Sequence, residues 1–243
     1  MAHNFSAVFL LGAFAAIPSL HAEEFKQVQV TSTERLNFAP GGLIRLDNSY
    51  GDLSIEVWDQ PAVEITVIKS MPFNYKLNQP EQATQHLERV AIKTDRRSDT
   101  ELAISTTLPT HNRFLSPTLS KTTTGSVGVQ YQVRVPRDSR LSIKHGTGYV
   151  SVTGVSGDIE ASVGRGDIML WLPPGSYSID AKTKLGPVSS ELEGATLSQY
   201  VVGQRLTAAN PPPSHRLHLR MGFGGITILK TLPESEALPE VTH

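Results

Sequence analysis

Hydrophobic and polar residues alternate between residues 141 and 172, and one short phrase recurs there every nine residues. The phrase is an apolar residue, four further residues, a glycine, and then apolar residues at the second and fourth positions after the glycine. Its copies are Ile143/Gly148/Val150/Val152, Val152/Gly157/Ile159/Ala161 and Ala161/Gly166/Ile168/Leu170. The same phrase occurs at Leu46/Gly51/Leu53/Ile55, at Leu219/Gly224/Ile226/Ile228 and, in weaker form, at Ala181/Gly186/Val188/Ser190.

The apolar alternation predicts half-buried strands, because successive side chains of a strand point to opposite faces. The glycines predict corners, where a positive φ or a close backbone approach is needed. Strands and corners at a fixed period indicate an all-β fold, either a single β-solenoid or an antiparallel sandwich or meander. We favour the solenoid, because the order is Gly-Asp and the hairpin pairs Asn-Gly and Asp-Gly are absent. Stacking would make Gly148, Gly157 and Gly166 equivalent corners, with one inward ladder formed by Val150, Ile159 and Ile168.

Outside the repeat, alternating segments predict further strands over 25–69 and 127–135. An insertion at about 70–128 separates them. It contains a helix predicted over Glu81–Glu88, a strand pair around the turn at 95–100, and a long polar loop over 107–126. The acidic, proline-bearing tail over 231–243 is expected to be disordered.

Residues 1–22 have the features of a signal peptide. An apolar segment over 5–17 precedes Leu20-His21-Ala22, an acceptable cleavage site. We therefore expect a mature β-solenoid domain over 23–230, exported to the periplasm or the cell surface, and sequencing of the exported protein should find Glu23 first. The alternative is a retained membrane anchor, since the positive charge before the apolar segment is weak. No other segment is long and apolar enough to span a bilayer.

The charge is balanced, with 22 basic and 23 acidic residues among 243, and forms no long run of either sign. This pattern argues against nucleic-acid binding and against a polybasic membrane patch. The chain has no cysteine, so disulfides, thiolate metal sites and a cysteine nucleophile are excluded.

Most candidates for chemistry have a simpler structural explanation. The tripeptide Arg165-Gly166-Asp167 matches an integrin-binding motif, but glycine and aspartate also belong to the corner. Asp158 and Asp167 are a candidate carboxylate pair for glycoside cleavage, although turn aspartates usually bond backbone groups. Calcium is not expected, because the Gly-Gly-x-Gly-x-Asp nonapeptide is absent. His215 and His218 face opposite ways in a strand, and His86 and His145 have no visible partner, so we expect no metal site, no cofactor and no catalytic residue.

The binding candidates are the aromatic residues Trp58, Tyr149 and Trp171. Trp171 lies between two apolar residues that are expected to face inward, so it should face outward, and Trp58 follows Val57 in the same phase. Outward aromatic side chains on a flat β-face stack on sugar rings or anchor a partner. The alternative, which we favour from the sequence, is that they pack beneath the loop of the insertion.

The phrases LDNSYGDLSIEV, VQYQVRVPRDSRLSIKHGTGYVSVTGVSGDIEASVGRGDIML and HLRMGFGGITILK resemble the bacterial DUF4097 putative-adhesin family. The resemblance covers about residues 28–230 and implies an exported β-solenoid-like domain without established enzymatic residues. The leading hypothesis is therefore a non-enzymatic, adhesin-like or envelope scaffold protein. Its partner would be a cell-envelope protein or a polysaccharide. The alternative is a polysaccharide lyase or hydrolase built on a β-helix.

Overall fold

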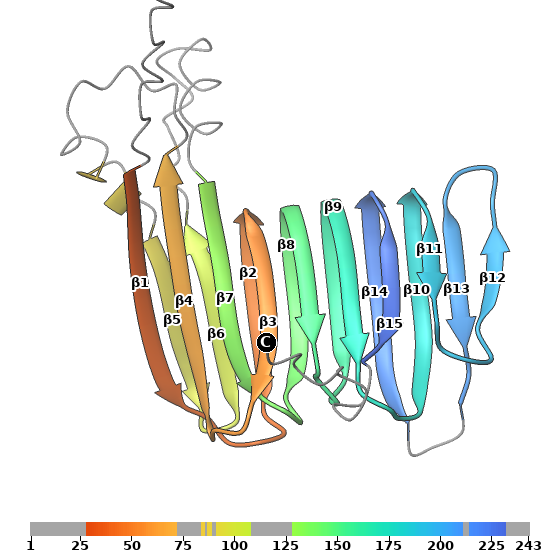
Figure 1. The fold of residues 1–243 in the computed structure, drawn as a ribbon, viewed down its shortest axis with the longest axis horizontal. Helices are drawn as coiled ribbons and strands as arrows, with labels where there is room; N and C mark the ends of the chain where they lie inside the picture. The colour runs from red at the N-terminus through yellow and green to blue at the C-terminus, as the bar shows by residue number, and fades with distance from the viewer. Residues whose placement is uncertain are drawn as a thin grey trace, which may run out of the picture.

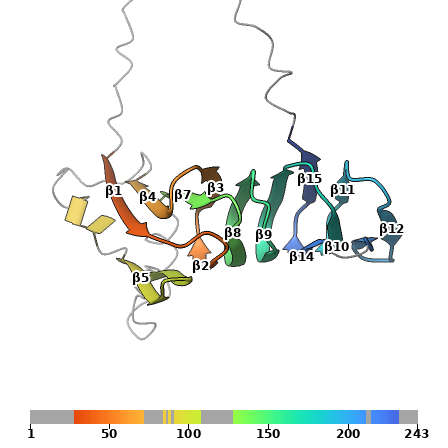
Figure 2. The same ribbon diagram turned by 90° about the horizontal axis from the view of Figure 1, so that it is seen from below.

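The computed structural model describes residues 28–71, 84–85, 87–88, 91–107, 128–210 and 214–231. These residues form fifteen strands of one mixed sheet, which is folded into two facing layers (Figures 1 and 2). The predicted all-β class is thereby confirmed. The predicted signal peptide, the loop over 108–126 and the tail from residue 232 lie outside the described residues.

The two layers share two long strands, β8 (Arg140–Thr153) and β9 (Ile159–Leu172), which bend from the rear layer into the front layer. The front layer contains β1 (Val28–Asn37), β4 (Ala62–Met71), β7 (Gly128–Pro136), β3 (Asp52–Trp58), β15 (Ile226–Lys230) and β11 (Val188–Ser190). The rear layer contains β5 (Ala91–Ser98), β6 (Glu101–Thr107), β2 (Leu43–Tyr50), β14 (His215–Phe223), β10 (Tyr177–Leu185), β13 (Gln204–Ala208) and β12 (Thr196–Gln199).

Five coils, each made of a rear strand, a glycine corner and a front strand, stack in parallel along the molecule. In space their order is β2–β3, β8, β9, β14–β15 and β10–β11. The coil that is last in sequence, β14–β15, therefore lies between two coils that precede it. Antiparallel strands extend the stack at both ends, with β1 and β4 beside β7, β5 beside β6, and β13 and β12 beside β10.

The hairpin interpretation is wrong for residues 141–172, because β8 and β9 pair in parallel. The expected nine-residue ladder is wrong as well. Val150 pairs with Ile168, whereas Ile159 pairs with Leu141, so one full coil takes 18 residues. Each coil crosses two layers and turns twice, and each nine-residue phrase covers only half of it.

The glycine corners explain why five of the six phrases are equivalent. Gly51, Gly148, Gly166, Gly186 and Gly224 all have a positive φ and follow one another along one edge of the stack, here called the glycine edge. A Cβ on Gly166 would lie 2.0 Å from the carbonyl oxygen of Gly148 in the next coil. Gly157 is the exception, since it lies at the opposite edge against the carbonyl oxygen of Ser139. Its expected equivalence with Gly148 and Gly166 is therefore wrong.

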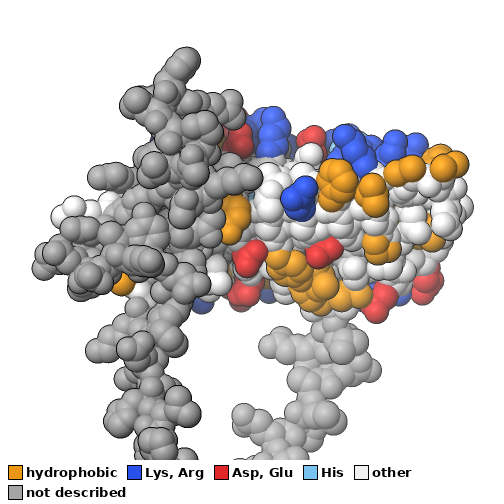
Figure 3. Space-filling view, turned by 90° about the horizontal axis from the view of Figure 1, so that it is seen from above, with side chains coloured by type: hydrophobic (Ala, Val, Ile, Leu, Met, Phe, Trp, Pro, Cys, Tyr) orange, Lys and Arg blue, Asp and Glu red, His pale blue; other side chains and the backbone are white. Residues whose placement is uncertain are grey.

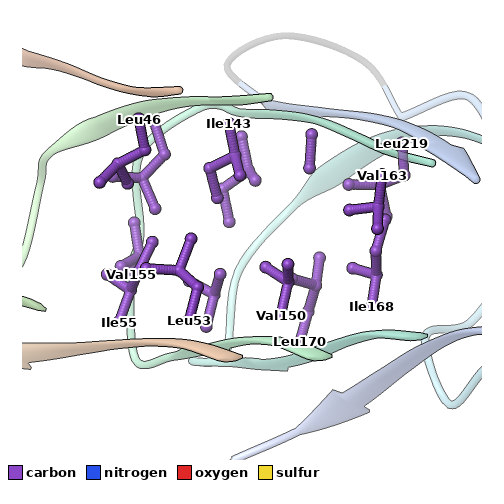
Figure 4. Close-up of a cluster of buried hydrophobic side chains, with 14 of the residues drawn as sticks. Leu46, Leu53, Ile55, Ile143, Val150, Val155, Val163, Ile168, Leu170 and Leu219 are labelled. Atoms are coloured by element: carbon purple, nitrogen blue, oxygen red, sulfur yellow. The ribbon is translucent and has the colours of Figure 1, made fainter. Parts of the chain in front are cut away.

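The core fills the space between the layers. Side chains of the rear layer, such as Leu46, Ile143 and Leu219, face side chains of the front layer, such as Leu53 and Val150 (Figure 4). These rows are the apolar positions of the phrase, held in register by the parallel pairing. The outward positions of both layers are thereby left as two flat, regularly spaced surfaces.

The insertion contributes to the same core. Thr84, Gln85, Leu87 and Glu88 have helical backbone, and Leu87 is fully buried. The other residues of the predicted helix lie outside the described residues. The predicted strand pair forms β5 and β6, and β6 pairs with β2 in the rear layer. Within the part of the chain that is described, no helix has the length and apolar character needed to cross a membrane.

Candidate binding surface

The outer surface of the front layer carries a strip of large side chains, here called the aromatic strip: Tyr149, Met169, Trp171 and Leu229. Val150, Ile168, Leu170 and Leu172 face the core, so the side chains between them face outward, as parity predicts. The hydroxyl of Tyr149 donates to Met169 Sδ at 3.0 Å, and Trp171 lies between Thr153 and Leu229 on neighbouring strands. Tyr149 on β8, Met169 and Trp171 on β9, and Leu229 on β15 therefore form one continuous apolar surface.

Aspartates at the corners fix the backbone beneath the strip. Asp52 Oδ1 accepts the backbone N–H of Tyr149 at 3.0 Å, and Asp167 Oδ1 accepts that of Gly225 at 2.7 Å. Burial, and then the nearby charge of Asp167, raise the pKa of Tyr149. A tyrosine phenol is protonated at neutral pH in any case, and this upward shift extends the pH range over which Tyr149 donates a hydrogen bond.

A hollow of about 590 Å³ lies beside the indole of Trp171. It is lined by Thr153, Trp171, Glu191, Leu229, Lys230 and Thr231. Trp171 and Leu229 supply an apolar wall, while Glu191 and Lys230 supply an acceptor and a donor at its border. An aromatic wall with polar groups at its border suits a sugar ring, which has apolar C–H faces and a rim of hydroxyls.

Trp58 belongs to a different environment from the other two aromatic candidates. Its indole N–H donates to the carbonyl oxygen of Ala62 at 2.8 Å, and the guanidinium groups of Arg35 and Arg134 lie 4.9 and 6.0 Å from its ring centroid. Both arginines come from neighbouring strands of the front layer, β1 and β7. The structure thus brings Tyr149 and Trp171 together but leaves Trp58 packed between cations at the N-terminal end.

The proposed carboxylate pair is not brought together. Asp158 directly precedes β9 and Asp167 follows the corner at Gly166, so nine residues of mostly extended chain, at about 3.3 Å per residue, carry them roughly 30 Å apart to opposite edges of the stack. Glycosidases hold their two carboxyl groups about 5–10 Å apart. Each carboxylate instead accepts a backbone N–H of the neighbouring coil, Asp158 that of Arg216 at 2.8 Å and Asp167 that of Gly225. These aspartates join coils.

The Arg165-Gly166-Asp167 tripeptide is part of the glycine edge. Gly166 is a corner residue, Asp167 holds the next coil, and the guanidinium of Arg165 lies 5.7 Å from the ring centroid of Phe223. All three residues therefore have structural partners within the stack.

The rear layer contains a charged cluster that the sequence did not predict. Asp180 Oδ1 accepts from Arg205 at 2.9 Å, Asp180 Oδ2 accepts from Arg220, and His218 Nδ1 lies 3.6 Å from Asp180. Burial opposes ionisation of Asp180, but the two arginines outweigh it and lower its pKa. The carboxylate is held as an anion, which makes it a poor proton donor. The parallel pairing of β10 with β14 brings Arg220 and His218 to Asp180, and the antiparallel pairing of β10 with β13 brings Arg205.

The three described histidines lie in separate places and form no metal site. His218 lies beside Asp180, whereas the ring of His215 lies 6.1 Å from that of Tyr177. His145 is buried, and His86 lies outside the described residues. Within the described ranges, no three His, Asp or Glu side chains gather in a way that could hold a metal ion.

No family model matches the chain, and no curated protein matches it. Among solved structures, the chain is similar to a "putative cell adhesion protein" from Clostridium sporogenes, with 13% identity and a TM-score of 0.46, over 83% of this chain and 100% of the other. It is also similar to a "putative adhesin" from Bacteroides fragilis, with 9% identity and a TM-score of 0.30, over 82% and 97% of the two chains.

Proposed function

We propose that this protein is an exported, non-enzymatic, adhesin-like binding or scaffold protein of the DUF4097 type, and that the aromatic strip is its contact surface for a cell-envelope polysaccharide. The observation that carries the proposal is the continuous outward strip of Tyr149, Met169 and Trp171, with a hollow bordered by Glu191 and Lys230 beside it. Sugar rings stack on partly exposed aromatic side chains, and border groups supply hydrogen bonds to hydroxyls.

The rigidity of the stack supports the same function. The aromatic side chains stand on strands whose neighbours are paired in register on both sides, so their spacing is fixed before a ligand arrives. A preformed surface loses little conformational entropy on binding. A repeated polymer would present its rings to side chains that are themselves regularly spaced.

Tryptophan fluorescence tests this proposal, because the chain has only two tryptophans. In the variant Trp58→Phe, Trp171 is the sole indole and reports on the strip. Titration with polysaccharide extracted from the envelope of the source cell should change its emission. Trp171→Ala should abolish binding in a pull-down with the same polysaccharide, whereas Trp58→Phe should leave it intact. Equal binding by Trp171→Ala and the parent chain would contradict the proposal.

A further inference from the structure

The glycine edge carries a second apolar surface, separate from the aromatic strip. Leu185 and Phe223 are neighbours in the parallel pairing of β10 and β14, and they are 54% and 53% exposed. Val201 and Val202, in the turn between β12 and β13, are 104% and 62% exposed. Gly203 packs this turn against the carbonyl oxygens of Thr183 and Lys184, which places the valines beside Leu185. We call Leu185, Val201, Val202 and Phe223 the apolar ridge.

The composition of the turn at 200–203 is unusual for a hairpin. The backbone N–H of Tyr200 donates to the carbonyl oxygen of Gly203, which closes the turn over two valines. Hairpin tips normally carry Asn, Asp, Gly, Pro or Ser, because these residues suit turn geometry and water. Two valines pointing into solvent break this rule without any gain in the core, and such local conflicts mark sites kept for another purpose.

Basic side chains flank the apolar ridge. Arg165 lies over Phe223, and Lys182 and Lys184 are exposed on the strand that ends in Leu185. Lys182 and Lys184 form no ion pair with any described residue, since the carboxylate of Asp180 is taken by Arg205 and Arg220. Figure 3 looks onto this edge and shows basic and hydrophobic side chains side by side over its C-terminal half.

Two acidic side chains at the corners of the glycine edge, those of Asp52 and Asp167, lie on its front side. Asp52 and Asp167 are both engaged there by backbone N–H groups of the neighbouring coils. The rear border of the apolar ridge is therefore cationic, while the tip of the edge is apolar.

We propose that the apolar ridge docks the molecule edge-on to a lipid bilayer with anionic headgroups. Apolar side chains that protrude as far as Val201 and Val202 insert between lipid headgroups, and the neighbouring cations attract anionic lipids. Lysines beside them reach the headgroup phosphates, and each is expected to strengthen binding about fivefold. The docked molecule would stand on the surface with the aromatic strip facing sideways, clear of the bilayer.

A polarity-sensitive dye tests the proposal at the position that matters. The chain lacks cysteine, so the full-length variant Val201→Cys can be labelled at one site only. Its emission should shift to shorter wavelength on phosphatidylcholine vesicles that contain phosphatidylglycerol, and less on phosphatidylcholine alone. The matched control is Ser98→Cys, an exposed position at the opposite edge, whose dye should not shift. Because the dye senses only its surroundings, attachment through any other segment does not mimic the result.

Further variants separate this proposal from the function proposed above. Lys182→Glu with Lys184→Glu should remove the shift of the Val201→Cys dye, whereas Trp171→Ala should leave it unchanged. No shift on anionic vesicles would overturn the proposal. So would a shift that appears without vesicles as the protein is concentrated, since it would assign the apolar ridge to contact between copies. Emission that is already shifted in the dilute protein would also overturn it, by showing that another part of the chain covers the ridge.

Discussion

Replacing Gly166 by alanine is expected to cost far more stability than replacing a glycine that only needs its backbone conformation. Gly166 has a φ of +126°, and an alanine Cβ would lie 2.0 Å from the carbonyl oxygen of Gly148. Gly194 has a φ of +74°, but a Cβ there would meet no atom within 4 Å. The pair therefore separates backbone strain from the close stacking of coils.

The magnitudes follow from these two terms. An alanine forced to a positive φ costs about 1–2 kcal/mol, which is the whole expectation for Gly194→Ala. At Gly166 the neighbouring coil must also retreat by roughly 1.4 Å to reach van der Waals contact. That movement stretches the backbone hydrogen bonds between β8 and β9 near the corner, where Thr147 pairs with Arg165 and Tyr149 with Asp167, and each such bond is worth about 0.5–1.5 kcal/mol. We expect about 3–5 kcal/mol for Gly166→Ala.

Urea unfolding followed by circular dichroism measures both variants against the parent chain. The decisive quantity is the difference between the two free-energy losses, which should be about 2 kcal/mol or more. Equal losses would refute this explanation, because they would mean that the coil of Gly148 moves away without loss of stability and that only the positive φ destabilises the variants.

Three other predictions concern the core, the interior histidine and the aspartates. Ile159→Ala should lower the free energy of unfolding by about 2–5 kcal/mol, because Ile159 is 1% exposed. Glu160→Ala, its outward neighbour, should change that free energy by less than about 0.5 kcal/mol. If urea titrations found the larger loss for Glu160→Ala, the assignment of Ile159 to the core and Glu160 to the surface would be wrong. Burial lowers the pKa of His145 below its usual 6.5, so the unfolded chain takes up the proton first as pH falls. The stability that neutral His145 contributes is present above pH 6.5 and is lost as the pH decreases. His145→Asn should therefore make the melting temperature less dependent on pH between roughly pH 5 and 6.5, and an unchanged dependence would contradict this. Asp158→Asn and Asp167→Asn should each lower the free energy of unfolding by about 0.5–2 kcal/mol, because an amide oxygen replaces a carboxylate as the acceptor. A loss as small as that of Glu160→Ala would show that these hydrogen bonds between coils contribute little to stability.

The local features of the fold were predictable because they depend on alternation and on glycine. The inward positions of β8 and β9 and the outward position of Trp171 follow directly from parity. The period could not be predicted correctly. Gly157 serves a close approach at one edge and Gly166 a corner with positive φ at the other, so two different turns produce the same phrase.

The arrangement of the coils and the clusters that depend on it left no trace in the sequence. The position of β14 between β9 and β10 depends on contacts between residues far apart in the sequence, because β14 pairs with both strands. The pairing of Asp180 with Arg220 is a consequence of that position. The separation of Trp58 from Tyr149 likewise follows from the packing of β1 and β7 around it, since outward parity alone says nothing about which neighbours an aromatic side chain meets.

The intercalated coil β14–β15 has a consequence for the order of folding. Both β9 and β10 pair with β14, so until residues 215–230 arrive, each presents an unpaired edge to the gap between them. The stack cannot close progressively as the chain emerges, because its middle is supplied last. Folding of the C-terminal half must wait until residues 215–230 have been made, and contacts this distant in sequence form slowly. A molecule truncated before residue 215 would expose two strand edges, which are templates for aggregation.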